Sequence, residues 1–436
     1  MANINSISPI KPELPEFPLP GGFTSSAEYL RHLVMQGLEQ RYPDKLDDVV
    51  KQAEHELSVI NQLGFNDYFL IIDDIVNWAN KQNISVGPGC GHAPASLVAY
   101  ALGITRIDPL RYGLIFERFA NLARPSSMLD IHIEISADKG KEKLESYVIE
   151  KYGKNRAGYI SADFFDKYGR KAFFGRHPSS VIISRNSLDT YGPVYHDPNS
   201  GTLVIKYTKS ELYDHALASF DLIWSEKLDD IFQSERAIRK RGKQYGSFSI
   251  NDIPLDDNAT FTLFCAGNTN EVFKFRPEEQ QETMRQLKPN CFDHLVAIEN
   301  LHRAPESMAF IPEYIDRRHG RKPVEHLHPC LEDILKETYG LVVYGEQIIR
   351  IVQRISGSTP EEAVVLCSNL IKARKGKQDT TNEKKDFVIS ATRRGFEKQN
   401  AERIFDYLAT LAAWPKSHAV GQALMTYQTA YLKANF

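Results

Sequence analysis

Polar side chains, two of them acidic, recur at alternate positions in the stretch LDIHIEI. Alternate residues of a strand point to one face about 7 Å apart, so Asp130, His132 and Glu134 would share a face. A further carboxylate, Asp221, lies in another short apolar stretch, ASFDLIW. Clustered carboxylates can hold the paired divalent ions that assist phosphoryl transfer. The spacing alone favours a polar, solvated sheet face over such a metal site.

A glycine-rich loop is the second feature that could do chemistry. Gly87, Gly89 and Gly91 precede a predicted helix with Pro94 in its first turn, in the segment VGPGCGHAPASLVAY. Backbone N–H groups in such a loop can cradle a phosphate. A tight turn from strand to helix needs the same glycines, and this alternative is favoured when the loop is considered by itself.

Basic residues gather in three places and could follow a nucleic-acid backbone. They are Arg236, Arg239, Lys240, Arg241 and Lys243, then Lys372, Arg374, Lys375 and Lys377, then Arg393 and Arg394. For each cluster alone a solvated helix face is the favoured interpretation. The net charge of -3 gives no overall attraction to nucleic acid. DNA binding would therefore depend on local patches.

The elements that position these residues follow from the apolar pattern. Residues 1–22 are rich in Pro and Gly and predict an extended strap. A capping pair, Ser25 and Glu28, begins a helix of roughly 15 residues, and further helices are predicted from Asp44 to Gly64 and from Tyr68 to Lys81. The stretch RHPSSVIIS predicts a buried strand, and from about residue 222 the chain is mostly helical.

Composition bounds the class of protein. The 436 residues are 42% hydrophobic and 25% charged, as in a globular chain of two or three packed units. No apolar run is long enough to span a membrane and no secretory signal is visible, so a cytoplasmic location and no membrane partner are expected. The five cysteines contain no CxxC pair, which argues against a zinc site or a disulfide framework.

Several ordered segments together resemble one known family. VGPGCGHAPASLVAYALGITRIDPLRYGLIFERF resembles VGPGRGSAAGSLVAY followed by LGIT-x-IDPL-x-Y-x-LLFERF. SMLDIHIEI lies where SMPDIDIDF is expected, ASFDLIW where KFDFLGL is expected, and PKSHAVGQALMTYQTAYLKANF resembles NKSHA followed by YQTAYLKAH. The chain resembles the palm and fingers core of the bacterial DNA polymerase III alpha subunit, a C-family DNA polymerase, from about residue 20 to its end. From the resemblance we expect the family's N-terminal PHP domain and its clamp-binding and OB regions to be missing.

The resemblance implies an α+β fold. We expect a nucleotidyltransferase-type palm with a mixed sheet and flanking helices over residues 23–221, and a mostly helical fingers domain over residues 222–436. The short interval between Glu134 and Asp221 suggests that the family's thumb is deleted near residues 155–175.

The resemblance also assigns roles to residues. The catalytic positions would be Asp130, His132, Glu134 and Asp221, of which Asp130, Glu134 and Asp221 would hold Mg²⁺ if the chain is active. The nucleotide-binding positions would be Gly89, Gly91, His92, Lys372, Lys416, Ser417 and His418. The DNA-binding positions would be Arg176, His177, Arg239 and Arg241. DNA is the expected partner, with a replication or repair protein as a further one.

Departures from the family pattern weaken the expected chemistry. Two of the family's metal-binding aspartates are replaced by His132 and Glu134, and a neutral imidazole is a poor ligand for a hard cation. In the glycine loop, Cys90 replaces an arginine and His92 replaces a serine. We therefore favour a pseudo-polymerase that binds DNA or a replication partner, with synthesis lost or strongly impaired. The alternatives are an active minimal DNA polymerase and an interaction module without nucleic-acid contact.

Overall fold

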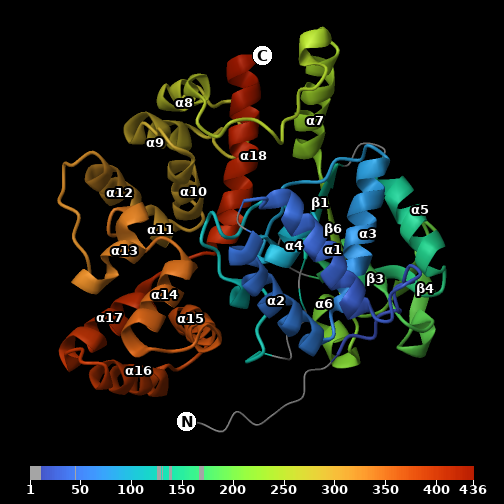
Figure 1. The fold of residues 1–436 in the computed structure, drawn as a ribbon, viewed down its shortest axis with the longest axis horizontal. Helices are drawn as coiled ribbons and strands as arrows, with labels where there is room; N and C mark the ends of the chain where they lie inside the picture. Colours follow the sequence, from blue (N-terminus) through green and yellow to red (C-terminus); the bar gives the residue numbers. More distant parts are fainter. Residues whose placement is uncertain (1–10, 45, 125–128, 130, 137–139, 166–170) are drawn as a thin grey trace. The chain divides into compact units, whose positions relative to one another are not determined.

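The computed structural model describes residues 11–44, 46–124, 129, 131–136, 140–165 and 171–436. They form two compact units, the first ending at Asp230 and the second spanning Ile231–Phe436 (Figure 1). The first unit holds a six-stranded sheet with its helices, and the second is helical. The α+β prediction is therefore confirmed. The boundary lies inside helix α7 (Glu226–Arg239), and the naming of the units as palm-like and fingers-like stays a prediction.

Three helices open the first unit: α1 (Ser26–Arg41), α2 (Leu46–Leu63) and α3 (Asn66–Lys81). Ser25 caps α1 by accepting the Glu28 N–H at 3.2 Å, as its sequence pattern indicates. Gly64 follows α2 with φ +80°, a conformation that favours glycine at a helix end. Ahead of them, residues 11–20 form no helix or strand, although the Phe17 N–H donates to Asp67 at 2.8 Å. The described part of the strap therefore packs against these helices.

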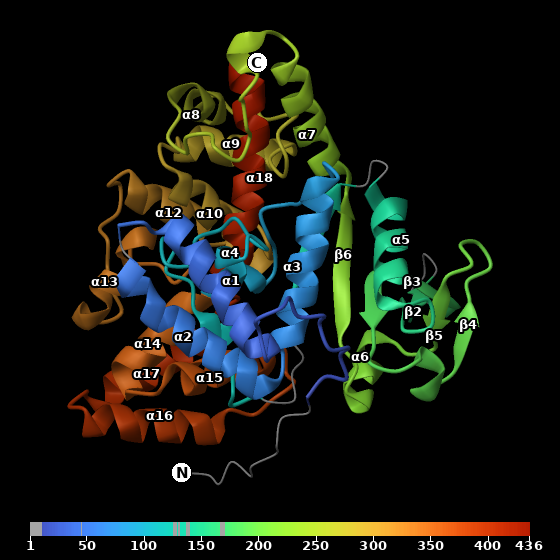
Figure 2. The same ribbon diagram turned by 45° about the vertical axis from the view of Figure 1, so that its right-hand side comes forward.

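The sheet has the order β1-β6-β3-β2-β5-β4. Its strands are β1 (His132–Ser136), β2 (Ala157–Phe165), β3 (Lys171–Ile183), β4 (Val194–His196), β5 (Leu203–Ile205) and β6 (Ser219–Ser225). The β1–β6 and β2–β5 pairs are parallel and the other three are antiparallel. Helices α3 and α5 (Gly140–Tyr152) pack against each other beside the sheet, as Figure 1 and Figure 2 show. The expected mixed sheet with flanking helices is thus confirmed.

The core lies on one face of this sheet. Ile131, Ile133 and Ile135 are buried within the apolar cluster formed by α1, α2, α3 and α5, whereas His132 and Glu134 are only half-buried. This alternation is what the sequence predicts for LDIHIEI over residues 131–135. Burial of the isoleucines fixes the register of β1, because a shift by one residue would exchange its two faces. The polar face of β1 is therefore held in place by its apolar one.

The stretch where a missing thumb is expected, near residues 155–175, holds β2 and β3. The two strands pair antiparallel, with Ala157 opposite Ile183, and β3 pairs in turn with β6. Residues 166–170, which join them, lie outside the described residues. The described parts of this stretch thus belong to the sheet.

The second unit is built from helices that begin with the latter part of α7. They are α8 (Asn258–Cys265), α9 (Glu278–Leu287), α10 (Phe292–Leu301), α11 (Pro305–Met308), α12 (Ile311–Arg318), α13 (Glu332–Leu335), α14 (Gly345–Ser356), α15 (Pro360–Arg374), α16 (Thr381–Arg393), α17 (Lys398–Thr410) and α18 (Lys416–Asn435). Helix α18 packs against α8 and α10. Among the described residues, no helix has both the length and the apolar character needed to cross a bilayer.

A close approach between α1 and α4 (Leu97–Ala101) gives a test of this packing. A Cβ atom at Gly37 would lie 2.1 Å from the carbonyl oxygen of Ala101. We expect Gly37→Ala to lower the free energy of unfolding by about 1–3 kcal/mol despite the higher helix propensity of alanine, because two backbones must separate. Urea denaturation measures the change. Gly21→Ala is the control, because no atom lies within 4 Å of its new Cβ, and equal stability of the two variants would contradict the packing.

Candidate functional site

The polar face of the sheet brings Asp221 and His132 together. Asp221 on β6 lies opposite His132 on β1 and opposite Ser180 on β3. The His132 Nε2 atom is 3.2 Å from Asp221 Oδ2, and the Ser180 hydroxyl donates to Oδ1. Asp221 is buried, with 8% of its side chain exposed. Two of the four expected catalytic residues therefore meet. Asp130 lies outside the described residues.

Lys209 is a member of this site that the sequence reasoning missed. It is the first residue of α6 (Lys209–Leu212), and its ammonium lies 2.5 Å from Asp221 Oδ2. The start of α6 is fixed by the Glu211 carboxylate, which accepts the Thr208 N–H and hydroxyl, each at 2.7 Å. The sequence TKSE carries this capping pattern and could have located the helix start. Nothing in the sequence pairs Lys209 with Asp221, because the contact depends on how α6 lies beside β6.

Charge compensation keeps the Asp221 carboxyl ionised. Burial alone would raise its pKa, but hydrogen bonds from His132, Lys209 and Ser180, with the charge of Lys209, hold the pKa well below its usual range. His177, the next basic group, has its pKa lowered by burial and by Lys209, against the opposing charge of Asp221. A buried carboxylate needs such partners, since an isolated one is strongly disfavoured. Asp221 thus has an internal counter-ion.

The described donors do not fit a Mg²⁺ pair. Magnesium prefers several oxygen ligands in near-octahedral geometry, and imidazole suits softer metals. Around Asp221 the described groups are one carboxylate, a hydroxyl, an imidazole and an ammonium. The ammonium would repel a cation approaching the same oxygen. No chemical step through a metal is therefore derived for this site.

Glu134 lies on the same strand face but packs on the glycine loop. A Cβ atom at Gly87 would lie 2.9 Å from Glu134 Cβ and 3.1 Å from its Oε2. The Gly87 N–H donates to the backbone oxygen of Glu134 at 2.8 Å, so loop and strand are joined at this point. A side chain at residue 87 would displace the carboxylate, which explains the glycine.

The glycine loop runs beside β1. Cys90 forms a bridge with His132, and Val86 with Ile135. Gly89 and Gly91 have φ values of +110° and +68°, which other residues rarely adopt. A Cβ at Gly91 would lie 3.3 Å from His132 Nδ1. Both glycines therefore serve a turn that brings the loop against the imidazole, and their binding of a nucleotide stays a prediction.

The helix that follows this loop is capped from within the protein. His92 precedes the short helix Ala93–Ala95, and α4 begins at Leu97 with Ser96 as its N-cap, accepting the Ala99 N–H at 3.1 Å. The Glu56 carboxylate accepts the Val98 N–H at 3.1 Å and the Ser96 hydroxyl at 2.9 Å. Helix N-termini favour anions. Here the fully buried Glu56 side chain of α2 occupies that position.

The expected DNA-binding residues of β3 are engaged within the first unit. Arg176 pairs with Glu145 at 2.9 Å and lies 3.7 Å above the Tyr159 ring, with little exposure of either charged side chain. The His177 Nδ1 atom accepts the Ser180 N–H at 2.9 Å. Arg176 thus anchors α5 to the sheet, and contact of either residue with DNA stays a prediction.

Arg239 and Arg241 both form contacts within the protein near the end of α7. Arg239 pairs with Glu235 at 2.5 Å and donates to the Phe248 backbone oxygen at 2.6 Å. Arg241 donates to the Phe436 backbone oxygen at 3.2 Å, which ties this turn to the end of α18. Both contacts are exposed, and binding of DNA by either arginine stays a prediction.

The nucleotide-binding residues expected in the second unit separate into three environments. Lys372 on α15 is exposed. Lys416 is buried, pairs with Glu337 at 2.7 Å and lies over the Tyr344 ring, and Ser417 beside it is also buried. His418 lines a cavity. Lys416 therefore has a structural partner for its charge, and the role of all four in binding a nucleotide stays a prediction.

Glu56 gives the site a testable pH dependence. Burial raises its pKa from 4.5 to about 7, against hydrogen bonds that lower it. The protonated form is thus favoured in the fold, and the stability it contributes is present below pH 4.5 and is lost as pH rises to about 7. Across this window the parent should lose on the order of 3 kcal/mol of its free energy of unfolding. Glu56→Gln keeps the shape of the side chain and cannot ionise, so we expect it not to show this loss.

Urea denaturation of both proteins at pH 5 and pH 8 measures this difference. The free energy of unfolding of Glu56→Gln relative to the parent should increase with pH. Glu39→Gln, at an exposed position on α1, is the control and should show no such trend. A constant difference between Glu56→Gln and the parent would refute the assignment.

Comparisons with known proteins agree with this architecture. Residues 28–174 match the bacterial DNA polymerase III alpha NTPase domain, and residues 227–395 match the bacterial DNA polymerase III alpha subunit finger domain. DNA polymerase III subunit alpha of Treponema pallidum is 33% identical over 98% of this chain and 41% of its own length. The subunit of Borreliella burgdorferi is 32% identical over 98% and 42%, and that of Thermus aquaticus 31% over 97% and 44%.

The chain thus spans less than half the length of these relatives. The two matched domains occur along the chain in the same order as the first and second units. The matches cover the helices and strands that carry His132 and the glycine loop, as well as most of the helical unit. The chain belongs to the bacterial DNA polymerase III alpha-subunit family.

Proposed function

We propose that this chain serves DNA replication or repair by binding DNA without template-directed synthesis. The observation that carries the proposal is the pairing of Asp221 with Lys209 and His132. A two-metal mechanism needs carboxylate oxygens free to hold two cations. Here one oxygen of Asp221 is bound by an ammonium and an imidazole, and the other by the Ser180 hydroxyl.

The environment of the glycine loop supports the same proposal. A triphosphate carries several negative charges and needs N–H donors or cations. The Ser96 and Val98 groups at the start of α4 already bind the Glu56 carboxylate. A carboxylate at this end would repel a phosphate when ionised. The loop itself carries Cys90 and His92 and no lysine or arginine.

The length of the matched region is the third support. The alignment with the Treponema pallidum subunit extends over 489 positions, although this chain has 436 residues. The relative therefore has residues inside the matched span that this chain lacks. We infer that part of this difference is the thumb, near residues 155–175. A shorter palm would contact less of a duplex and release fewer counter-ions.

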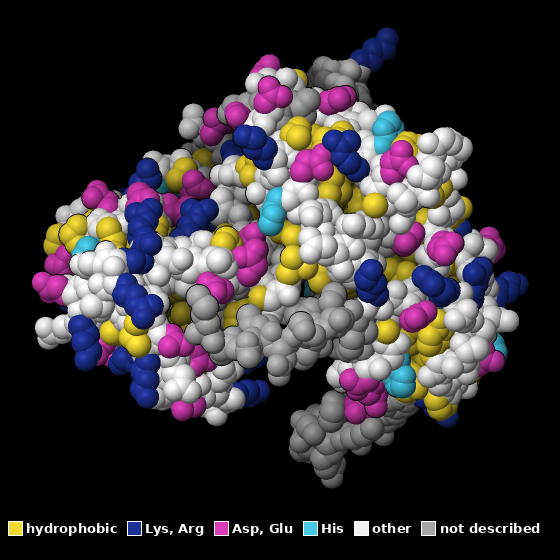
Figure 3. All heavy atoms as spheres, turned by 60° about the horizontal axis from the view of Figure 1, so that its bottom comes forward, with side chains coloured by type: hydrophobic (Ala, Val, Ile, Leu, Met, Phe, Trp, Pro, Cys, Tyr) yellow, Lys and Arg dark blue, Asp and Glu magenta, His cyan; other side chains and the backbone are white. Residues whose placement is uncertain are grey.

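A basic surface on the second unit is our candidate for DNA contact. Exposed lysines and arginines lie on α15, α16 and the turns after them: Lys372, Lys375, Lys377, Lys385, Arg393 and Arg394. On the face shown in Figure 3, a row of Lys and Arg side chains runs over the left-hand part of the molecule. This surface contrasts with the net charge of -3 for the whole chain. It supports backbone contacts that do not depend on base sequence.

Primer extension tests the loss of synthesis. With a primed template, all four dNTPs and Mg²⁺ or Mn²⁺, we expect the parent chain to extend no more primer than Asp221→Asn does. The physical reason is the internal cation at Asp221. Extension by the parent that Asp221→Asn abolishes would overturn the proposal.

A variant designed to gain Mn²⁺ binding distinguishes a site blocked by Lys209 from a preparation that is simply inactive. His132→Asp together with Lys209→Ala replaces the imidazole with a carboxylate and removes the ammonium. We expect Mn²⁺ to raise the melting temperature of this double variant, because two carboxylates then face each other. Lys209→Ala alone is the matched control and should respond less. A Mn²⁺ response of the parent equal to that of the double variant would count against the internal cation.

DNA binding should weaken with salt and depend on the basic surface. We expect the variant Lys375→Gln, Lys377→Gln, Lys385→Gln to bind a fluorescent duplex more weakly. The slope of log K against log salt should become shallower by about 1 to 3, since each lost phosphate contact removes about 0.9. Fluorescence anisotropy from 50 to 200 mM salt would measure this.

The matched control changes the same charge elsewhere. Lys51, Lys143 and Lys154 are exposed on the first unit, and their replacement by glutamine should leave the slope nearer to that of the parent. Equal effects of the two triple variants would show that net charge, and not the α15–α16 surface, controls binding. Absence of any salt-dependent binding would favour an interaction module without nucleic-acid contact.

A further inference from the structure

The extended strap before α1 crosses one end of the central strands β3 and β6. These strands pair antiparallel, with Ile182 opposite Ser219, so the end of β3 and the start of β6 lie together. Glu13 of the strap bonds to both sides of this place. Its N–H donates to the Ala216 oxygen at 2.7 Å, and its carbonyl accepts the Arg185 N–H at 3.1 Å. Glu13 therefore bridges the segment before β6 and the segment after β3.

Contacts along the strap hold Glu13 in this position. Leu14 is buried in the core of the first unit, and its carbonyl accepts the Arg185 Nε at 3.1 Å. Further along, the ring of Phe17 stacks on Tyr29 of α1, with the ring centroids 6.3 Å apart. The hydrogen bonds of Glu13 thus come from a segment that is fixed by its neighbours.

The residue that accepts the strap N–H has a strained backbone. Ala216 has φ +55°, in the left-handed region that residues other than glycine rarely adopt. The Leu217 N–H donates to the Leu212 oxygen at 3.0 Å, and both leucines are buried in one cluster. A helix that ends in a Schellman motif has this pattern, and its left-handed residue is usually glycine. The turn therefore has an alanine where glycine is favoured, and the strap binds the carbonyl of that alanine.

The Ala216 turn connects the two partners of the buried ion pair. Lys209 opens the helical segment formed by α6 and the 3-10 turn η4 (Tyr213–His215), and Asp221 lies on β6, which follows the turn. Ala216 sets the direction in which the chain leaves this segment. Because the segment is folded back beside β6, the Lys209 ammonium reaches Asp221 Oδ2 at 2.5 Å. A change of backbone conformation at Ala216 would move Lys209 away from Asp221.

We propose that the strap is a latch that holds Lys209 on Asp221. With Glu13 in place, its N–H stabilises the strained Ala216 turn and the ammonium stays at the carboxylate. With the strap withdrawn, the turn relaxes, residues 209–217 open, and Lys209 leaves Asp221. The latch rests on the proposed function, because it regulates the ion pair on which that function depends.

Position 13 allows a variant that removes only the hydrogen bond. The Leu14 N–H donates to the Pro12 oxygen at 2.9 Å, and the φ of Glu13 is negative, as in an inverse γ-turn. The central φ of such a turn, about −75°, is close to the value of about −65° that proline fixes. Glu13→Pro therefore keeps the turn and deletes the donor to Ala216. Glu13→Ala, which retains the N–H, is the matched control.

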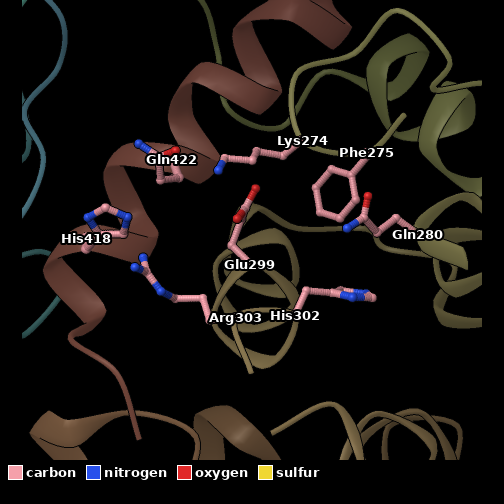
Figure 4. A pocket seen from close by; sticks show the side chains of 8 residues that line it. All are labelled: Lys274, Phe275, Gln280, Glu299, His302, Arg303, His418 and Gln422. Atoms are coloured by element: carbon pink, nitrogen blue, oxygen red, sulfur yellow. The ribbon is translucent and has the colours of Figure 1, made fainter. Parts of the chain in front are cut away.

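Hydrogen–deuterium exchange of the full chain, followed by mass spectrometry, measures the latch. We expect Glu13→Pro to speed exchange of residues 209–217 by about three- to tenfold, since loss of one hydrogen bond favours local opening. Helix α10 of the second unit, which carries Glu299 in Figure 4, is the internal reference and should exchange alike in all variants. Acetylation of Lys209 by acetic anhydride should also become faster relative to the exposed Lys143, because an ammonium paired with a carboxylate keeps its proton.

Two further variants test the latch from its other side. Glycine adopts the left-handed turn without help from the strap, so Ala216→Gly combined with Glu13→Pro should return exchange of residues 209–217 to within about twofold of the parent. Arg185→Met removes the side-chain bond to the Leu14 oxygen and leaves the Glu13 N–H in place. It should loosen the strap and speed exchange of the same residues by about twofold.

The exchange and acetylation rates decide the proposal. Rates like those of the parent in both Glu13→Pro and Arg185→Met would overturn it, and so would equal acceleration in Glu13→Ala and Glu13→Pro. Acceleration that Ala216→Gly does not reverse would show that the strap acts by another route than this turn, which also contradicts the latch. Primer extension by the parent would refute the proposed function and leave these rates unchanged, so the two failures are distinguishable.

Discussion

The pairing of Asp221 with Lys209 is the interaction on which the polar face of the sheet depends. Asp221 lies between β1 and β3, where three strands bring His132 and Ser180 to its two oxygens. A buried carboxylate in this position needs a cation. In this chain the cation is a side chain of the neighbouring helix α6. At the start of α4 the Glu56 side chain likewise binds the Ser96 hydroxyl and the Val98 N–H, so this helix end has its partner within the same chain.

Much of the first unit could be predicted because its signals are local. Neighbouring residues are enough to recognise the apolar stripes of α1, α2 and α3. The same holds for the alternation of residues 131–135. Strand order could not be obtained that way, since β6 begins at Ser219 and yet lies between β1, which ends at Ser136, and β3, which ends at Ile183. The short strands β4 and β5, with three residues each, carry too little alternation to be recognised.

The sequence predicts those members of the candidate site that residue type and local pattern identify. It does not predict the members whose role depends on how distant elements pack. Alternation placed His132 on the polar face of its strand, and the family resemblance grouped His132 with Asp221 among the catalytic positions. The roles of Lys209 and Glu56 depend on how α6 and α2 pack beside other elements, and no pattern in the sequence expresses that packing. Likewise, Arg176 and Lys416 are basic residues in matching segments, but each has an acidic partner that only the fold supplies.

Anomalous scattering from crystals of the parent chain soaked in Mn²⁺ tests the internal cation most directly. The account predicts no manganese peak at coordination distance from Asp221, with the Lys209 ammonium still bound to its Oδ2 atom. A manganese ion seated on Asp221, with Lys209 displaced from the carboxylate, would contradict it.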